Sequence, residues 1–380
     1  MSIEFQACAT PTVGIELELQ LLDAESLELT NAIGPLMELY SDQQFVKPEF
    51  FQSSVELNSP ISSDTSEART HMLATARGLL QHCDELGMRV CGAGTHAFDR
   101  KLALITPVPR YLSIKNEFGY TAVTQVTFST HVHVGMPSGN AAVFVMRHLT
   151  PCLPALLAVA ANSPFWRGYD TGYAGYRHCI LAAAQNYGLP GYFNDWDDFV
   201  RFWQMSTRAH MHEAIRDIHW DIRPRPALGT LELRIMDAAS TIGHACALAA
   251  FARSLMVYLM HRVSADLDRC LPDRLPYHIE RINRYRAFHC GLDAEHICDE
   301  TGRTQPMRKF VDDLIELVMP VAAEIGEYQN MQSLCRMLEQ GAGYRRQLGI
   351  FEETGSAREV MSCLVGDLRD EAITVEAVNQ

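Results

Sequence analysis

Residues 228–237, with the sequence Leu-Gly-Thr-Leu-Glu-Leu-Arg-Ile-Met-Asp, alternate between apolar and polar side chains and decide the fold. This alternation has the period of a β-strand that is buried on one face. Leu231, Leu233 and Ile235 would face a core, while Glu232 and Arg234 would face the other side. A carboxylate and a guanidinium on one sheet face form either a ladder of salt bridges or a polar site prepared for a ligand.

The same alternation recurs in two upstream segments, residues 13–21 and 54–60. The first places Glu16 and Glu18 on one face, and the second places Glu56 opposite its apolar neighbours. Neighbouring carboxylates on one face repel each other unless a cation or solvent lies between them. A solvated strand face and a metal site therefore both remain possible for these segments taken alone.

A fourth strand is expected at residues 124–136, where His131 and His133 share a face with Ser129. Two histidines at this spacing can ligate a metal or contact a nucleotide. An ordinary pair of sheet histidines would show the same pattern, so this motif does not decide between the two interpretations.

The rest of the chain supplies helices and turns. Asp64, followed three residues later by Glu67, has the form of a capping box and predicts a helix that ends at Gly87. We also predict a hairpin over residues 13–29, a tight turn with close backbone approach at 92–94, a helix broken by prolines at 138–161, a surface loop that is a candidate lid at 169–191, helices at 241–264, 307–325, 329–339 and 356–368, and a turn between helices at 341–346.

Strands thus dominate residues 1–240 and helices dominate residues 241–380, with no alternating β-α-β rhythm. This order predicts an α+β fold around a mainly antiparallel sheet. We expect residues 1–380 to form a single catalytic domain.

Composition restricts the class of protein. The chain has 380 residues, is 47% hydrophobic and carries a formal net charge of −14, which argues against a nucleic-acid or membrane-surface binder. Only four of its 32 basic residues are lysines, so arginine, whose planar fork suits carboxylates and phosphates, is expected to handle anions. Arg223 and Arg225, which flank a proline, are candidates by charge and position.

Eleven cysteines without a C-x-x-C pair indicate reduced thiols and a cytoplasmic protein. Residues 1–10 lack the basic and apolar regions of a signal peptide, so we expect none. The longest apolar run, at 246–260, is interrupted by Arg253 and predicts a buried helix rather than a membrane span.

If the alternating strands share one sheet, a single face carries Glu16, Glu18, Glu56 and Glu232 beside the histidine pair and Arg234. Such a covered cluster of carboxylates is strongly unfavourable without cations. Hard oxygen ligands indicate Mg²⁺ or Mn²⁺ rather than a thiolate zinc site. No G-x-x-x-x-G-K-[ST] loop occurs in the sequence, so metal ions and arginines would have to hold any nucleotide phosphates. Together these features predict a phosphoryl-transfer site.

Five motifs of the chain resemble those of the carboxylate–amine ligase family, also called the glutamate–cysteine ligase type 2 family. The motifs that carry the resemblance are GIELE at 14–18, VEL at 55–57, HVHVG at 131–135, HWDIRP at 219–224 and LELRIMD at 231–237. The resemblance implies a fold like the catalytic part of glutamine synthetase and the guanidino kinases. In that fold a curved, mainly antiparallel sheet has helices on its convex face and binds ATP and Mg²⁺ on its concave face.

The resemblance also implies site residues and a reaction. Arg234 matches the arginine that stabilises the transferred phosphoryl group, and the metal- and nucleotide-side positions match Glu16, Glu18, Glu49, Glu56, His131 and Glu232. His133, Arg223 and Arg225 are further candidates on the nucleotide side. The implied reaction is weak glutamate–cysteine ligase activity, which converts ATP, L-glutamate and L-cysteine or another amine to the γ-glutamyl product, ADP and phosphate. A homodimer or larger homo-oligomer is also implied.

Two other functions remain open from the residues themselves. A guanidino-kinase-like phosphotransferase would phosphorylate a substrate and stop there. A metal-dependent hydrolase or a metal-binding module would use the carboxylates without ATP.

Overall fold

The computed structural model describes residues 3–40, 42–184, 187–262 and 274–378. The main sheet contains β1 (Val13–Asp23), β2 (Val46–Pro48), β3 (Ser54–Asn58), β4 (Met88–Cys91), β5 (Ser129–Gly135), β8 (Ile222–Arg225) and β9 (Thr230–Asp237). Two separate strand pairs are β6 (Phe165–Trp166) with β7 (Tyr169–Asp170) and β10 (Glu295–Ile297) with β11 (Thr304–Pro306).

The α-helices lie before, between and after these strands. They are α1 (Ile33–Glu38), α2 (Thr65–Glu85), α3 (Pro109–Phe118), α4 (Tyr120–Thr124), α5 (Gly139–Leu149), α6 (Leu153–Ala160), α7 (Arg177–Leu181), α8 (Trp196–Arg208), α9 (Ile242–Arg262), α10 (Tyr277–Cys290), α11 (Met307–Glu324), α12 (Tyr328–Gln340), α13 (Gly343–Thr354) and α14 (Ala357–Val378).

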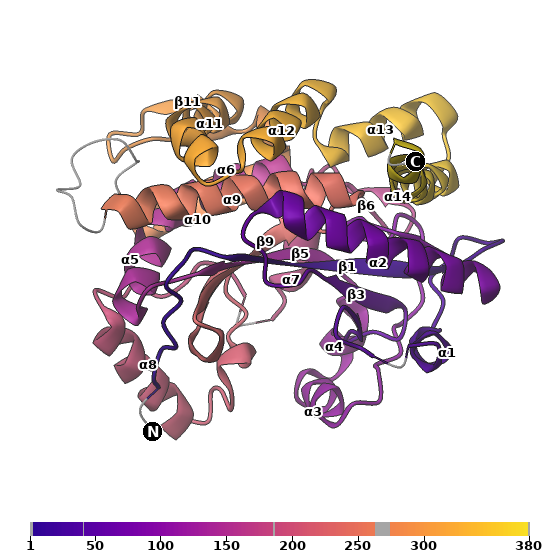
Figure 1. Cartoon of the computed structure of the whole chain (residues 1–380), viewed down its shortest axis with the longest axis horizontal. Coiled ribbons are helices and arrows are strands. Elements are labelled where there is room, and N and C mark those ends of the chain that lie inside the picture. The colour runs from indigo at the N-terminus through magenta and orange to yellow at the C-terminus, as the bar shows by residue number, and fades with distance from the viewer. Residues whose placement is uncertain (1–2, 41, 185–186, 263–273, 379–380) are drawn as a thin grey trace.

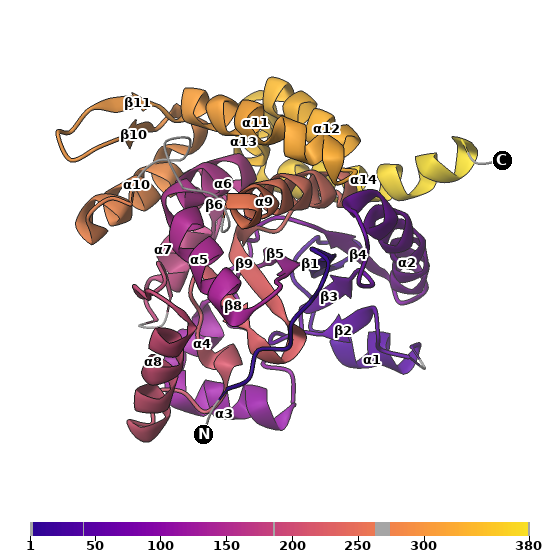
Figure 2. The same ribbon diagram turned by 60° about the vertical axis from the view of Figure 1, so that its left-hand side comes forward.

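The main sheet has the strand order β2-β3-β1-β5-β9-β8, with β4 paired to the far end of β1, and each of these pairs is antiparallel. The predicted α+β fold with a mainly antiparallel sheet is confirmed. Helices α2, α9 and α6 cover one face of the sheet, and α3, α4 and α8 lie on the opposite side (Figure 1). The same layers are visible after rotation (Figure 2).

The apolar residues of the alternating strands form the core against the covering helices. Leu17, Leu57, Val132, Leu231 and Leu233 are all fully buried. Burying one such side chain contributes about 1.5–3 kcal/mol, so a one-residue slip of any strand would be strongly opposed. The hydrophobic pattern therefore fixes which face carries the polar residues.

Two helical stretches are long and apolar enough to cross a membrane, Gly139–Ala160 and Ile242–Arg262. However, 83% and 89% of their apolar windows are buried inside the fold. α9 packs against both β1 and α2, so the predicted buried helix at 246–260 is confirmed.

Strand β9 contains one irregularity that its sequence did not reveal. Val132 of β5 pairs with Leu233, whereas Thr130 pairs with Met236, so the register shifts by one residue around Arg234. Such a β-bulge leaves an extra residue on one strand and changes the direction of its side chains. Ile235 is buried in the core as predicted, but the alternation ends there, because Met236 is also buried in the core.

Several local predictions also need correction. The predicted hairpin at 13–29 is present but short, because residues 27–29 return beside β1 over a single bridge, between Leu22 and Leu29, flanked by two backbone hydrogen bonds. The expected surface loop at 169–191 contains α7, whose Arg177 and His178 are buried. The expected turn between helices at 341–346 is present but shorter, because only Gly341 and Ala342 separate α12 from α13 and residues 343–346 begin α13. Helix α10 was not predicted, because its charged sequence lacks a clear apolar stripe.

The predicted close backbone approach at 92–94 is confirmed, and it yields a stability test. A Cβ atom on Gly92 would lie 1.9 Å from the backbone oxygen of Ala239. We expect Gly92→Ala to destabilise the protein by about 1–3 kcal/mol or more, because the backbone segments at Gly92 and Ala239 must move apart. The control is Gly78→Ala within α2, where no atom lies within 4 Å of the new methyl group. That change should stabilise by about 0.5–1 kcal/mol. Equal unfolding midpoints for the two variants would contradict the close approach.

Candidate active site

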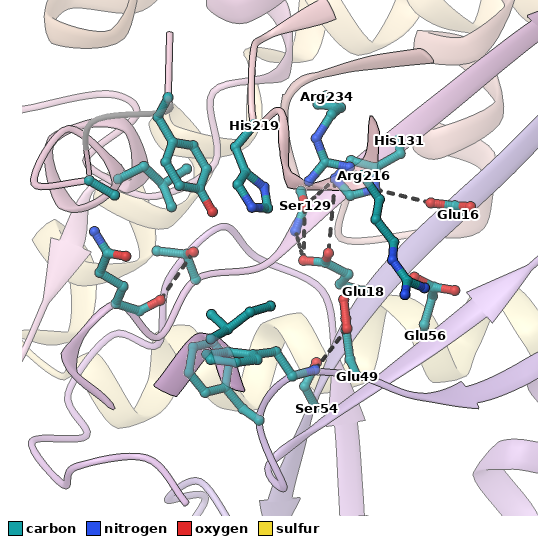
Figure 3. A pocket seen from close by; sticks show the side chains of 18 of the residues that line it. Glu16, Glu18, Glu49, Ser54, Glu56, Ser129, His131, Arg216, His219 and Arg234 are labelled. Carbon is teal, nitrogen blue, oxygen red and sulfur yellow. Dashed lines mark hydrogen bonds and ion pairs between the residues drawn. The ribbon is translucent and has the colours of Figure 1, made fainter. Parts of the chain in front are cut away.

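A pocket of about 420 Å³ lies on the sheet face opposite α9, and polar side chains converge in it (Figure 3). Nine of the ten predicted site residues line it: Glu16, Glu18, Glu49, Glu56, His131, Arg223, Arg225, Glu232 and Arg234. The tenth, His133, lies beside the pocket and contacts Glu16 through Nε2 at 3.4 Å.

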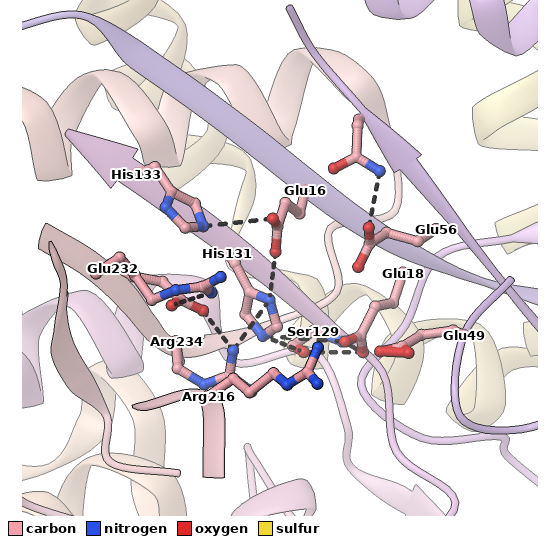
Figure 4. Close-up of polar contacts among 12 residues, drawn as sticks. Glu16, Glu18, Glu49, Glu56, Ser129, His131, His133, Arg216, Glu232 and Arg234 are labelled. Atoms are coloured by element: carbon pink, nitrogen blue, oxygen red, sulfur yellow. Dashed lines mark hydrogen bonds and ion pairs between the residues drawn. The ribbon is translucent and has the colours of Figure 1, made fainter. Parts of the chain in front are cut away.

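Strand register explains why residues far apart in sequence meet here. Glu18 pairs directly with Glu56, and Glu16 pairs with His131. Glu232 pairs with His133 on one side and with Arg223 on the other. Directly paired residues point to the same face of a sheet, so the predicted convergence on one face is confirmed (Figure 4).

Glu232 is the centre of an arginine cluster and is completely buried. Its carboxylate accepts hydrogen bonds from Arg223 at 2.8 and 3.1 Å, from Arg225 at 2.9 Å and from Arg234 at 2.5 Å. Burial alone would raise the pKa of Glu232, but the charges of Arg223 and Arg234 outweigh it and hold the pKa well below its usual range. Glu232 is therefore an anion that orients three cations.

The three arginines differ in the donors they have left for a ligand. Arg223 also donates through Nη1 to the backbone oxygens of Arg216 and Ile218, so four of its five N–H groups are engaged within the protein. Among the described residues, Arg225 finds an acceptor only for Nη1, and 25% of its side chain is exposed. Arg234 faces His131 at 3.5 Å and retains further N–H groups toward the pocket. Arg225 and Arg234 are thus better placed than Arg223 to contact a bound anion.

On the other side of the pocket, two buried carboxylates, Glu18 and Glu49, have no lysine or arginine within 4.0 Å among the described residues, and a third, Glu56, has only Lys47. Glu18 accepts hydrogen bonds from the N–H and hydroxyl of Ser129 at 2.6 and 2.8 Å, and Glu49 accepts from Tyr111 at 3.0 Å. Glu56 accepts from Asn58 and lies 3.9 Å from Lys47. Burial, followed by the charges of neighbouring glutamates, raises the pKa of Glu18 to about 7 and that of Glu56 well above its usual range. Burial likewise raises the pKa of Glu49.

His131 has the protonation state of a metal ligand. When Glu18 is ionised, the single hydroxyl hydrogen of Ser129 is donated to it, and this hydroxyl then accepts from Nε2 of His131 at 2.8 Å. The Nδ1 atom of His131 is then left with a lone pair 3.1 Å from the Glu16 carboxylate. Burial and the charge of Arg234 lower the pKa of His131 to about 4, which keeps the ring neutral. This lone pair also faces Nη1 of Arg234 at 3.5 Å, and a divalent cation between Nδ1 and the Glu16 carboxylate would relieve the repulsion between these two acceptors.

These donors fit a divalent cation. Ligand atoms of Glu16, His131 and Glu232 all lie within 4.8 Å of one another, which is the one such His, Cys, Asp or Glu group found in the described ranges. Glu18, Glu49 and Glu56 supply further buried carboxylate oxygens around it. Oxygen-rich donor sets with a single imidazole favour Mg²⁺ or Mn²⁺ over zinc.

The raised pKa of Glu18 predicts a pH-dependent stability difference in the metal-free protein. A folded-state pKa of about 7, above the unfolded value, gives a contribution that is present at acid pH and lost as the pH rises through 7. The unfolding free energy of Glu18→Gln minus that of the wild type should therefore increase by about 2–3 kcal/mol as the pH rises from 5 to 8. Denaturant unfolding of both proteins across this range measures the difference, and a gap independent of pH would contradict it.

Sequence analysis missed several pocket residues. Arg177 reaches the pocket from α7, and Tyr111 reaches it from α3. Tyr187 stacks on His219 with ring centroids 4.9 Å apart, and both line the wall opposite the carboxylates. The segments of Arg177, Tyr111 and Tyr187 lack alternation or a recognisable motif, and His219 opens the HWDIRP motif at 219–224 but was not predicted as a site residue.

The pocket lining also includes apolar side chains. They are Phe50, Phe51, Ile114, Phe118 and Leu181, and Phe50 packs edge-on against Tyr111 at 5.5 Å. A ligand of this pocket could therefore combine anionic groups with a flat or apolar part, as a nucleotide does.

Comparison with known proteins adds to this geometry. The model of the family described as Glutamate-cysteine ligase family 2 matches residues 12–362. A Trichormus variabilis protein named "Putative glutamate--cysteine ligase 2" is 42% identical over 369 residues, covering 97% of this chain and 95% of that protein. A Mycolicibacterium vanbaalenii protein named "Putative glutamate--cysteine ligase 2-1" is 33% identical over 368 residues, covering 96% of each.

Two solved structures share the fold. A glutamate–cysteine ligase from Francisella tularensis in complex with AMP has a TM-score of 0.67 and 10% sequence identity, covering 99% of this chain and 95% of that chain. A bifunctional glutathione synthetase from Pasteurella multocida has a TM-score of 0.65 and 13% identity, covering 95% of this chain and 52% of that chain.

Proposed function

The chain belongs to glutamate–cysteine ligase family 2, and on that premise we propose that it joins the γ-carboxylate of L-glutamate to the amino group of L-cysteine with hydrolysis of ATP. The products are γ-glutamylcysteine, ADP and phosphate. The observation that carries this proposal is the single sheet face on which an oxygen-rich cation site adjoins Arg225 and Arg234. Such a face suits the transfer of a phosphoryl group.

Chemistry requires two steps. A carboxylate is a poor electrophile, so a γ-carboxylate oxygen first attacks the γ-phosphorus of ATP, which gives an acyl phosphate and releases ADP. The amino group then attacks the acyl carbon, the carbon–oxygen bond to phosphate breaks, and one amine proton is lost. No enzyme nucleophile is needed in either step.

The residues divide between holding cations and holding anions. We infer that Glu16, Glu18, Glu49, Glu56, His131 and Glu232 hold Mg²⁺, or Mn²⁺ in its place. A bound divalent ion neutralises charge on the phosphates of ATP. Arg234 would contact the transferring phosphoryl group and Arg225 another phosphate oxygen. Arg223, with most of its donors already engaged, keeps Glu232 and hence Arg234 in place.

An assay of ADP release separates this function from its alternatives. With Mg²⁺ and ATP, we expect steady ADP release only when glutamate and cysteine are both present, because the acyl phosphate must be consumed. A kinase would release ADP with one substrate, and a hydrolase would not need ATP. Glu16→Gln, purified in the same way, controls for contaminating ATPases, and Asp313→Asn in a surface ion pair controls for handling. Steady release with glutamate alone would contradict the ligase.

Three broader expectations remain proposals. Residues 1–380 would act as one catalytic unit, which the continuous core from Val13 to Ala372 supports. Ten cysteines in the described ranges are free thiols, which supports a reducing, cytoplasmic location. A homodimer or larger assembly, implied by the family resemblance, is tested by sedimentation of the purified chain.

A further inference from the structure

The β-bulge between β5 and β9 carries Arg234, and its backbone also makes hydrogen bonds to residues outside these two strands. The backbone N–H of Arg234 donates to the backbone oxygen of Asp221 at 2.7 Å. Its backbone oxygen accepts from Nη2 of Arg177 at 3.3 Å, and that of Ile235 accepts from Nη1 at 3.5 Å. The first contact continues the β8–β9 ladder, in which Ile222 pairs with Leu233, and the two contacts from Arg177 satisfy backbone oxygens beyond the end of that ladder. Together these contacts fix the position of the bulge.

Asp221 is itself fixed by an arginine from the helical layer. Arg284 of α10 donates to Asp221 through Nε at 2.6 Å and through Nη2 at 2.9 Å. The same Nη2 lies 3.1 Å from Nδ1 of His178 in α7. The side chains of Arg284 and Asp221 are only 13% and 6% exposed. A buried bidentate pair of this kind has little freedom to move.

Neither Arg284 nor Asp221 lines the pocket, so neither can touch a ligand there directly. Asp221 immediately precedes β8, and its own N–H donates to the backbone oxygen of Gly188 at 2.7 Å. The position of Asp221 therefore sets both the start of β8, which carries Arg223, and the N–H contact of Arg234. The ion pair links a helix outside the sheet to the arginine cluster inside the pocket.

We propose that Arg284 and Asp221 are positioning residues for Arg234. They hold the β-bulge in the place where the guanidinium of Arg234 contacts the transferring phosphoryl group. This rests on the proposed role of Arg234 in phosphoryl transfer. A displacement of about 1 Å in a catalytic group can lower the rate of a reaction about 100-fold. A helix-borne pair that prevents such a displacement therefore affects turnover without contacting substrate.

The test is steady-state ADP release with ATP, Mg²⁺, glutamate and cysteine. Lysine cannot bind Asp221 through two N–H groups, so Arg284→Lys should lower kcat about 10- to 30-fold while KM for ATP changes less than about threefold. Asp221→Asn, which keeps the side-chain volume, should act in the same direction. Combined with Arg234→Lys, either change should add almost nothing, because residues that act as a unit are non-additive.

The matched control is Arg253→Lys. Arg253 of α9 also forms a buried pair, with Glu327, and donates to the backbone oxygens of Pro11 and Ile325, and none of these residues lines the pocket. The Arg253→Lys variant should lose thermal stability and keep the kcat of the wild type. If Arg284→Lys does not fold, Asp221→Asn provides the same comparison.

The outcomes separate this inference from the function on which it rests. A kcat near wild type for folded Arg284→Lys or Asp221→Asn, with a large loss for Arg234→Lys, overturns the positioning role alone. Losses that multiply in the double variants overturn it as well. Near-normal turnover of Arg234→Lys would instead refute the proposed role of Arg234 itself.

Discussion

Replacing Arg234 with lysine is expected to lower kcat about 100-fold and to leave KM for ATP nearly unchanged. Lysine keeps the positive charge but presents a point charge in place of a planar fork with two parallel N–H groups. An interaction made mainly in the transition state affects kcat far more than substrate binding. The measurements are initial rates at saturating glutamate and cysteine over a range of ATP concentrations.

A purely structural role for Arg234 predicts a different result. Glu232 would still be paired with Arg223 and Arg225 after the substitution, so its burial remains compensated. If Arg234 has only a structural role, the Arg234→Lys variant should lose some thermal stability and retain most of its turnover. Thermal unfolding recorded beside kinetics therefore decides the case, and Arg69→Lys, in the Glu371 pair on the opposite face, is the control. Lost stability with normal turnover would remove Arg234 from the reaction.

Glu18→Gln is expected to weaken Mg²⁺-dependent binding of a non-hydrolysable ATP analogue by roughly 10- to 100-fold at limiting Mg²⁺. The glutamine oxygen can still accept both hydrogen bonds from Ser129, so the fold should be intact. What is lost is a buried negative charge that no residue within 3.5 Å neutralises in the described structure. That charge is the property a divalent cation requires.

The binding experiment needs two comparisons. Glu28→Gln, in an exposed pair with Lys101, is the control for removing a carboxylate outside the pocket. Titration with Mg²⁺ should restore analogue binding to Glu18→Gln at higher metal concentrations. Unchanged affinity at limiting Mg²⁺ would show that Glu18 does not take part in cation binding.

The sequence by itself determined the face on which each polar residue lies. Alternation along residues 13–21, 54–60 and 228–234 is enforced by the burial of leucines and valines, since a slip of one residue would expose an entire apolar row. The convergence of the glutamates and of His131 on one face follows from that pattern once the strands are neighbours. The capped helix beginning after Asp64 was equally local, because its side chain accepts from the N–H groups of Ser66 and Glu67.

Only the tertiary structure decided how the arginines are used. The order of strands places Arg223 beside Glu232, and two backbone oxygens then engage both N–H groups of its Nη1, which charge and position could not reveal. The bulge at Arg234 depends on partners 13 or more residues away, Asp221 and Arg177, and Arg284 belongs to a helix without a sequence signal. Side-chain periodicity records burial along one strand. It contains no information about which distant backbone groups will satisfy an unpaired N–H or C=O, and here those groups set the geometry of the site.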